Sequence, residues 1–377
     1  MKKLFVLFTS LTAFFLHGGE ISVAACNEML GLNIFAARDT WNFTQMRSRL
    51  GIRLSGNTGR FSARLNRQVA GVTAVELIVY TTNNDRSVSR ITIIYANKGD
   101  TTSRTRSQIR NAERQVKERI DAKLGASRRN NFSIGSLRVR ADFWQCRFAK
   151  FYLETDKGEF AMLHITPVNA PEGRESVGDR NFADNVRRNN FGDVLIANIP
   201  MVNQGGKGYC VPATLERVFL YYGITMDMHH LADIGGTDPD EGTYTDKMMD
   251  DIASLRRRAG LRSTDISSLS IRAIARHIDR GYPVVWQMYS TSELNGVYSF
   301  SQRNRSNAAS AQEWKRALRR VDIPRSTEGP HVCLIIGYNR ETDEIAVSNS
   351  WGQAFAVRWI PLKVARKVSR QLLVLYP

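Results

Sequence analysis

One stretch near the middle of the chain decides the fold: residues 203–214 read NQGGKGYCVPAT. From Cys210 onward, apolar side chains recur at the spacing of a buried helix, at Val211, Leu215, Val218, Phe219 and Tyr222. Pro212 suits the first turn of a helix, and Gly223 suits the position just past its end. The pattern therefore predicts a buried helix over residues 210–222 that begins at Cys210.

A cysteine in this position has a chemical consequence. The N-terminus of a helix is the positive end of its dipole, and a thiol placed there is expected to have a lowered pKa. The thiolate is the form of cysteine that attacks a carbonyl carbon, so Cys210 is a candidate nucleophile. Gln204 stands six residues earlier. Its side-chain N–H could bind an oxyanion together with the backbone N–H of Cys210.

The partners that a nucleophilic cysteine needs stand far downstream. His331 begins an apolar run that predicts a buried strand over 332–338, and residues 344–349 predict a second strand antiparallel to it. This hairpin sets Asn349 beside His331, where the amide oxygen can accept from the imidazole and fix its tautomer. Trp351 could then cover that hydrogen bond. Alone, a buried cysteine or histidine is more often a packing residue, but the conjunction favours catalysis.

The order Gln, Cys, His, Asn, with NSWG at 349–352, resembles papain-like cysteine peptidases. The strings IPMVNQ at 199–204, GYCVPA at 208–213 and GYPVVW at 281–286 are similar to a bacterial branch related to bacteriocin-leader (double-glycine) processing peptidases. The resemblance covers residues 195–360. It implies an α+β fold in which the helix with the cysteine packs on an antiparallel sheet that carries the histidine and the asparagine.

The resemblance also implies roles for single residues. Cys210 would be the nucleophile, His331 the general acid/base, Asn349 the orienting group and Gln204 the oxyanion donor, and no cofactor would be needed. Leader-processing enzymes more often carry Asp where Asn349 stands, and they usually form the first domain of an exporter, whose segments this sequence lacks. A double-glycine leader is therefore not the expected substrate.

The N-terminus resembles a targeting segment. Two lysines precede an apolar run over 4–16, and small residues end at Ala25, which predicts a signal peptide over residues 1–25 and a secreted or periplasmic protein. The residues before Cys26 also resemble a bacterial lipobox, so a lipid anchor through Cys26 is the alternative. No later run is long enough to span a bilayer, which predicts no transmembrane segment in the mature chain.

Export makes the four cysteines informative. Cys210 must stay reduced, and Cys333 is expected to be a buried packing thiol on the strand of His331. If Cys26 is not acylated, a disulfide between Cys26 and Cys146 is the natural pairing. No pair of Cys or His residues has the spacing typical of zinc ligands, so no metal site is predicted. The adjacent His229 and His230 are expected to face solvent.

At 377 residues the chain is long enough for two domains. We expect a basic α+β domain over 26–167, a linker over 168–193 and a papain-like peptidase domain over 194–377. Strands are expected at 74–81, 89–96, 133–141, 146–154, 159–165 and 283–288. Helices are expected at 104–124, 246–259, 270–279 and 311–321, with a surface loop at 295–307.

The formal net charge of +17 is uneven. Residues 27–170 contain 24 Lys and Arg and 12 Asp and Glu, a net charge of +12. Residues 171–377 contain 27 Lys and Arg and 23 Asp and Glu, a net charge of +4. Such a surface could hold an anionic envelope polymer, although a solvated basic face explains it as well. The sequence shows no nucleic-acid-binding motif, and no nucleic acid is expected as a partner.

These observations predict an exported bacterial cysteine peptidase that hydrolyses peptide or isopeptide bonds of a peptide or protein substrate through a thioester. Gly235 and Gly236, together with Trp351, are candidate substrate contacts, although a plain turn explains the glycines equally well. The same site could serve a transpeptidase or amidase. A non-catalytic envelope-binding protein with a peptidase-like fold, or an N-terminal domain removed on maturation, are further alternatives.

Overall fold

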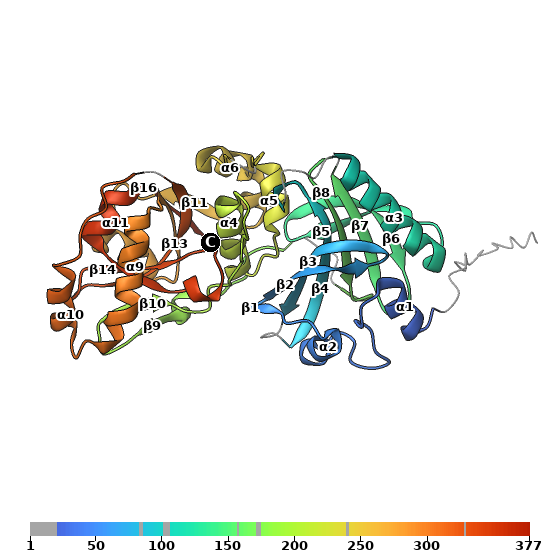
Figure 1. Cartoon of the computed structure of the whole chain (residues 1–377), viewed down its shortest axis with the longest axis horizontal. Helices are drawn as coiled ribbons and strands as arrows, with labels where there is room; N and C mark the ends of the chain where they lie inside the picture. Colours follow the sequence, from blue (N-terminus) through green and yellow to red (C-terminus); the bar gives the residue numbers. More distant parts are fainter. Residues whose placement is uncertain are drawn as a thin grey trace, which may run out of the picture.

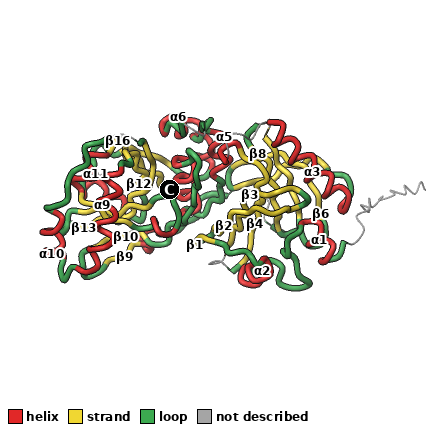
Figure 2. The backbone as a smooth tube through the Cα atoms, viewed as in Figure 1, coloured by secondary structure: helices red, strands yellow, loops and turns green. Residues whose placement is uncertain are grey.

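Two antiparallel sheets lie side by side in the computed structural model, which describes residues 21–82, 86–100, 106–156, 158–170, 175–238, 241–327 and 329–377. The first sheet belongs to the N-terminal half of the chain and the second to the C-terminal half. Figure 1 shows α4 and α5 between them. Figure 2 shows that strands dominate the N-terminal half, while helices surround the second sheet.

The first sheet has the strand order β1-β2-β3-β4-β8-β7-β6-β5, with every neighbouring pair antiparallel. Its strands are β1 (Ser55–Asn57), β2 (Arg60–Val69), β3 (Val72–Thr82), β4 (Ser87–Asn97), β5 (Arg128–Ile134), β6 (Leu137–Gln145), β7 (Lys150–Asp156) and β8 (Phe160–Thr166). The central strands β4, β7 and β8 are buried along most of their length, so both faces of the sheet are covered.

One face of this sheet is covered by helix α3 (Arg106–Leu124), with α1 (Val23–Leu30) and α2 (Phe43–Leu50) at its side. Helix α3 buries a narrow stripe of Ile109, Ala112, Val116 and Ile120 and exposes its charged positions. This is the amphipathic pattern expected for a helix that packs on a sheet with one face. The other face of the sheet meets the second half of the chain.

The second sheet has the order β11-β16-β12-β13-β10-β9, and β14 and β15 branch from β13. Its strands are β9 (Val186–Arg188), β10 (Asp193–Ile196), β11 (Arg262–Asp265), β12 (Val284–Tyr289), β13 (Pro330–Asn339), β14 (Glu344–Ser348), β15 (Arg358–Pro361) and β16 (Ser369–Tyr376). Strand β13 is buried from His331 to Asn339 and is the centre of the sheet.

The helices of the second half are α4 (Cys210–Tyr221), α5 (Met228–Ile234), α6 (Thr245–Asp251), α7 (Ala253–Arg258), α8 (Ile271–Ile278), α9 (Ser292–Asn304), α10 (Ala311–Leu318) and α11 (Leu362–Val368). Helix α4 packs on β13, and α9 packs on β15. Strand β13 pairs with β14 in a hairpin, so α4 lies against the strand that carries His331 and is joined to the strand that leads to Asn349. This α+β arrangement is the fold class that the sequence predicted.

Several predicted elements agree closely with the structure. The predicted strands at 74–81 and 89–96 correspond to β3 and β4, and residues 83–85 of the turn between them lie outside the described residues. The predicted helix at 104–124 corresponds to α3. In the second half, the helix at 210–222 ends one residue early, and Gly223 follows with the positive φ expected at its end.

Other expectations were wrong. Residues 133–141 form a hairpin rather than one strand, because Gly135 turns the chain with a φ of +56°. The expected loop at 295–307 contains most of α9, whose Thr291 caps the helix and whose few apolar residues form too narrow a stripe to stand out. The expected helix at 246–259 is broken at Ile252 into α6 and α7.

The second sheet also begins within the predicted linker at 168–193, because β9 forms its edge. The three residues of β9 are Val186, Arg187 and Arg188, which are half-buried or exposed, so this strand has no run of apolar side chains. Most of the predicted signal peptide lies outside the described residues, and Val23 to Ala25 form the first turn of α1. None of the helices in the described ranges combines the length and the apolar composition needed to cross a membrane.

The N-terminal helix brings two cysteines together. The side chain of Cys26 on α1 is fully buried, and its Sγ lies 3.9 Å from the Sγ of Cys146, which follows β6. Both thiols are unbonded here. A disulfide requires a separation of about 2.05 Å, so movements of about 1 Å by each sulfur would suffice. The inward direction of Cys26 favours this pairing over acylation.

We therefore expect the chain isolated under oxidising conditions to contain a Cys26–Cys146 disulfide. The bond would close a loop of about 120 residues and, on the chain-entropy account, would stabilise the fold by up to about 4–5 kcal/mol. Non-reducing peptide mapping should find the linked peptides, and Cys146→Ser should lower the midpoint of thermal unfolding. Two free thiols at these positions after exposure to oxidised glutathione would contradict the expectation.

Candidate active site

The predicted nucleophile lies at the first residue of α4. Tyr209 occupies the N-cap position without a side-chain cap, so the first backbone N–H groups of the helix point toward the half-buried Cys210. Hydrogen bonding from the backbone of Val332, the residue after His331, acts on the Cys210 thiol. Thr214, one turn along α4, donates from Oγ1 to the carbonyl of Val332 at 3.2 Å. The thiol is thus held at the start of strand β13.

His331 and Asn349 form the predicted pair. Nε2 of His331 lies 2.9 Å from Oδ1 of Asn349, and both side chains are buried. An amide oxygen can only accept, so Nε2 carries the proton and Nδ1 of a neutral ring keeps its lone pair. The Trp351 ring stacks on the imidazole with a centroid separation of 4.5 Å and an interplanar angle of 27°. This stacking shields the hydrogen bond, as the sequence predicted.

Gln204 lies in the loop just before α4 and is buried. Its backbone N–H donates to the carbonyl of Ser350 at 2.9 Å, which ties this loop to the segment that carries Asn349. Its side-chain Nε2 donates to the carbonyl of Lys207 at 3.1 Å. An amide nitrogen has two N–H groups, so one remains for an oxyanion. The structure therefore places the four predicted residues on adjoining segments: Cys210 against the backbone of Val332, His331 beside Asn349, and Gln204 against Ser350.

Burial sets the protonation of the pair. Burial raises the pKa of the Cys210 thiol above its ordinary value, although hydrogen bonds from the backbone of Val332 and of the helix start oppose the increase. Burial also lowers the pKa of His331 to about 4, against a smaller opposing effect of the Asn349 hydrogen bond. The expected net lowering of the Cys210 pKa is thus not found. At neutral pH the site holds a thiol and a neutral imidazole.

Arg217 holds the segments of the site in place, and sequence reasoning missed it. It lies on α4 two turns after Cys210 and is fully buried. Its guanidinium donates to the carbonyl of Pro200 at 2.8 Å, to the carbonyl of Ser348 at 3.0 Å and to the Ser348 hydroxyl. Pro200 leads into the Gln204 loop and Ser348 precedes Asn349, so one side chain joins the three segments.

Comparison with known proteins agrees with this geometry. Residues 196–370 match the model of the Peptidase_C39 like family. The matched residues include the helix of Cys210 and the hairpin of His331 and Asn349. This segment is a C39-like cysteine peptidase domain. Among curated proteins, none matches the sequence.

Three solved structures are similar to the C39-like domain and its surroundings. A chain described as a C39-like peptidase from Bacillus anthracis is 16% identical, with 49% of this chain and 98% of that one covered and a TM-score of 0.33. The peptidase domain of Streptococcus ComA, a bifunctional ABC transporter of a quorum-sensing pathway, is 14% identical, with coverages of 48% and 99% and a TM-score of 0.32. Xylellain, a cysteine protease from Xylella fastidiosa, is 13% identical, with coverages of 53% and 90% and a TM-score of 0.34.

The candidate substrate glycines lie at the end of α5. The backbone N–H of Gly235 donates to Leu231, and that of Gly236 donates to Asp233. Gly236 has a φ of +59°, and a side chain on Gly235 would meet Met248 of α6. Both glycines therefore serve the turn and helix packing, and their N–H groups are already used. This placement favours the plain turn over contact with substrate.

The expectation that His229 and His230 face solvent was wrong. Both are buried, because α5 packs against the first sheet. His229 lies 3.0 Å from Nζ of Lys207 and 2.6 Å from the carboxylate of Asp227. His230 lies 2.9 Å from the carboxylate of Glu154. The adjacent pair suggested a polar surface because the local sequence does not show that α5 docks on the first sheet, where Glu154 meets His230.

A buried ion pair joins α4 to the first sheet. Nε of Arg60, on β2, donates to Oε1 of Glu216 at 2.7 Å, and both side chains are almost fully buried. Tyr80 of β3 donates from its hydroxyl to Asp227, the N-cap of α5, at 2.9 Å. Burial raises the pKa of Glu216 to about 7, although Arg60 opposes this increase. The first sheet is thus docked through charges rather than through apolar surface alone.

A pocket of about 620 Å³ lies where the first sheet meets the Gln204 loop. Its lining comes from both halves of the chain and includes Arg53, Arg64 and Glu76 on one side and Gln204, Lys207 and Gly352 on the other. Of the four predicted catalytic residues, Gln204 is part of this lining. The pocket therefore leads to the oxyanion side of the site.

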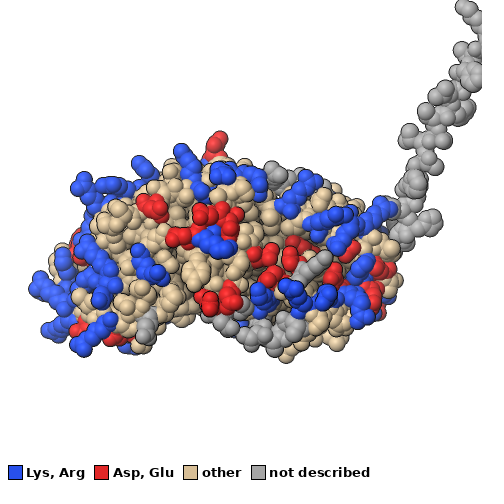
Figure 3. All heavy atoms as spheres, turned by 90° about the horizontal axis from the view of Figure 1, so that it is seen from above, with Lys and Arg blue, Asp and Glu red and all other residues tan. Residues whose placement is uncertain are grey.

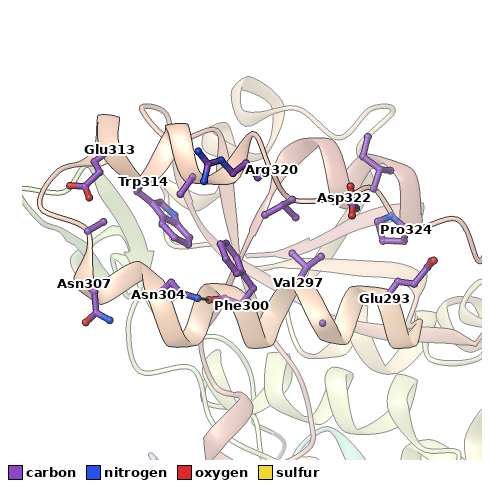
Figure 4. A pocket seen from close by; sticks show the side chains of 15 residues that line it. Glu293, Val297, Phe300, Asn304, Asn307, Glu313, Trp314, Arg320, Asp322 and Pro324 are labelled. Atoms are coloured by element: carbon purple, nitrogen blue, oxygen red, sulfur yellow. Dashed lines mark hydrogen bonds between the residues drawn. The ribbon is translucent and has the colours of Figure 1, made fainter.

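A second pocket, of about 700 Å³, lies between α9, α10 and the segment that follows α10 (Figure 4). Phe300 and Trp314 stack there with a centroid separation of 5.6 Å, and Val297 points into the same space. The four predicted catalytic residues are absent from its lining. We therefore assign the candidate active site to the pocket that Gln204 lines.

Replacing Arg217 should disrupt stability and activity together. Arg217→Met removes the donor to the carbonyls of Pro200 and Ser348 and leaves these buried acceptors unsatisfied, which should cost about 2–5 kcal/mol in the free energy of unfolding. Urea unfolding measures this loss. Arg217→Lys keeps the charge but not the fork, and should lose less stability. An Arg217→Met chain as stable and as active as the native chain would contradict this role.

Proposed function

We propose that the chain is an exported cysteine peptidase that hydrolyses peptide or isopeptide bonds through a thioester on Cys210. The C39-like family supports peptidase activity, and the predicted signal peptide supports export. The hydrogen bond of 2.9 Å from His331 Nε2 to Asn349 carries the assignment of roles. It leaves Nδ1 of His331 as the base for the thiol.

The first half of the reaction forms the thioester. As Sγ of Cys210 attacks the scissile carbonyl carbon, the thiol proton passes to Nδ1 of His331. The oxyanion accepts hydrogen bonds from Nε2 of Gln204 and the backbone N–H of Cys210. The C–N bond then breaks, and the departing amine takes the proton from His331. Asn349 keeps the ring aligned while it carries the extra charge.

The second half releases the acid. Water attacks the thioester carbon and gives a proton to His331, and the C–S bond breaks. The sulfur then regains the proton, which restores the neutral pair. His331 is unprotonated throughout the neutral range, because burial lowers its pKa to about 4. It is a weak base for a thiol of raised pKa, so we expect proton transfer to accompany the attack on the carbonyl carbon and not to precede it.

The substrate would enter through the pocket between the two halves of the chain. Arg53 and Arg64 are exposed there, whereas Lys207 is buried beside Glu76. Two exposed guanidinium groups at the wall of a cleft attract negative charge. We infer that the substrate carries acidic side chains or a carboxylate close to the scissile bond.

The proposed roles predict a distinctive dependence on pH. Iodoacetamide should label Cys210 slowly at pH 6, and the rate should rise about tenfold per pH unit up to the raised thiol pKa. The specificity constant kcat/KM should fall only as the pH drops through about 4, because protonated His331 cannot accept the thiol proton. Peptide mapping across pH and hydrolysis of a peptide library measure the two quantities.

Variants complete this test. Cys210→Ala should abolish hydrolysis, and His331→Ala should lower kcat by about 10²–10⁴-fold. His277→Ala is the matched control, since His277 lies on α8 outside the site. A labelling rate that stays constant from pH 5 to pH 7 would show a preformed thiolate and refute the neutral pair. A Cys210→Ala chain that still hydrolyses peptides would refute the nucleophile.

The cleft predicts a preference for acidic substrates. Arg64→Glu should raise KM for an acidic peptide by about 2–5-fold with little change in kcat, and the effect should shrink at high salt. Arg67→Ala is the control, because Arg67 is exposed on the same strand but does not line the pocket. Comparison of an acidic with a basic peptide of equal length measures the preference. Equal KM changes for both peptides would contradict it.

A further inference from the structure

A second cluster of titratable side chains lies away from Cys210, where α5 meets the first sheet. Glu154 of β7, His164 of β8 and His230 of α5 each point one ligand atom to the same place, and these atoms lie within 4.8 Å of one another. All three side chains are buried. The proposed peptidase mechanism uses none of them.

The geometry of the cluster is that of a ligand set. Nε2 of His164 lies 3.1 Å and Nε2 of His230 2.9 Å from the same oxygen, Oε2 of Glu154. Ligands at about 2.0–2.2 Å from a tetrahedral zinc ion are about 3.3 Å apart from one another. The two nitrogen–oxygen separations are thus close to those that a zinc ion requires. Two histidines and a glutamate are also an established donor set for zinc.

The surroundings of His164 suit this role. Nδ1 of His164 lies 3.0 Å from the hydroxyl of Thr92, which can orient the ring as outer partners of zinc ligands do. Nδ1 of His230 is buried and has no hydrogen-bond partner among the described residues. Binding of a metal at Nε2 would require that the proton of His230 move to Nδ1. The cluster is therefore built around the two Nε2 atoms.

Charge around the cluster favours a cation. Burial raises the pKa of Asp233 to about 6, and the nearby carboxylates of Asp156, Glu159 and Glu154 add to this increase. Figure 3 shows Asp and Glu gathered near the middle of the face that carries α5 and α6. Arg90 of β4 opposes a cation, but its guanidinium lies over the Tyr80 ring at 4.3 Å. The carboxylates of Glu154, Asp156 and Asp233 thus lie near the cluster together with Arg90.

We propose that Glu154, His164 and His230 bind a zinc ion that joins α5 to the first sheet. The ion takes three protein ligands and leaves one position for water. Because α5 follows α4 after a short turn, the ion helps to fix the first sheet, and with it Arg53 and Arg64, beside the Gln204 loop. The site is distinct from the Cys210 centre, so it stands whether or not the proposed peptidase mechanism is right.

Metal analysis of the full chain tests the proposal. The tag-free chain is prepared with Cys210→Ala, so that the thiol and His331 cannot bind zinc, and its zinc content is measured by plasma mass spectrometry after dialysis. We expect about one zinc ion per chain. Glu154→Gln and His230→Gln should each lower the content at least tenfold, and His277→Gln should leave it unchanged. Cobalt substitution should give visible absorption bands of a tetrahedral site.

Two further measurements keep the result clear if a variant does not fold. Competition between the Cys210→Ala chain and a chromophoric zinc chelator gives the affinity without any change at the cluster. Added zinc should raise the thermal midpoint of that chain and not of Glu154→Gln. Absence of zinc binding in the competition, or an equal zinc content in Glu154→Gln, would overturn the proposal. The cluster would then be a hydrogen-bonded His–Glu–His group.

Discussion

The buried guanidinium of Arg217 is the constraint on which the candidate active site depends. A charge removed from water must be satisfied where it lies, and leaving it unpaired costs several kcal/mol. Arg217 is satisfied only when the Pro200 segment and the Ser348 segment are both folded against α4. These segments lead directly to Gln204 and Asn349. The helix that carries Cys210 therefore cannot reach its buried position without assembling the rest of the site.

Glu216, the residue before Arg217, imposes the matching constraint on the other side of α4. Adjacent positions on a helix point about 100° apart, so one faces the catalytic strands and the other faces the first sheet. Separation of the two halves would leave Glu216 without Arg60, and Asp227 without Tyr80. This argues against an N-terminal half that is discarded on maturation. Its strands also supply one wall of the pocket beside Gln204.

The chemistry of the candidate site was predictable from sequence because each of its members stands beside a strong local signal. Cys210 precedes an apolar helix pattern, and His331 and Asn349 flank a strand hairpin. The raised pKa of the Cys210 thiol was not predictable, since burial against the start of β13 outweighs the opposing effect of the helix N-terminus. Arg217 and Glu216 were missed for a related reason. Charged residues within an apolar helix are normally assigned to solvent, and only tertiary partners reverse that assignment.

The contacts between the two halves of the chain could not be predicted from the sequence. A metal-binding motif can be recognised in a sequence when one helix or loop supplies two of the ligands. Glu154, His164 and His230 instead come from three separate elements. Glu154 and His164 meet only through the pairing of β7 with β8, and His230 joins them only when α5 docks. The absence of the residue spacing typical of zinc ligands thus excludes a zinc site within one short segment, but not a site formed where α5 meets the first sheet. The three side chains meet only when α5 is docked on the first sheet, so the zinc content of the chain would report on that docking.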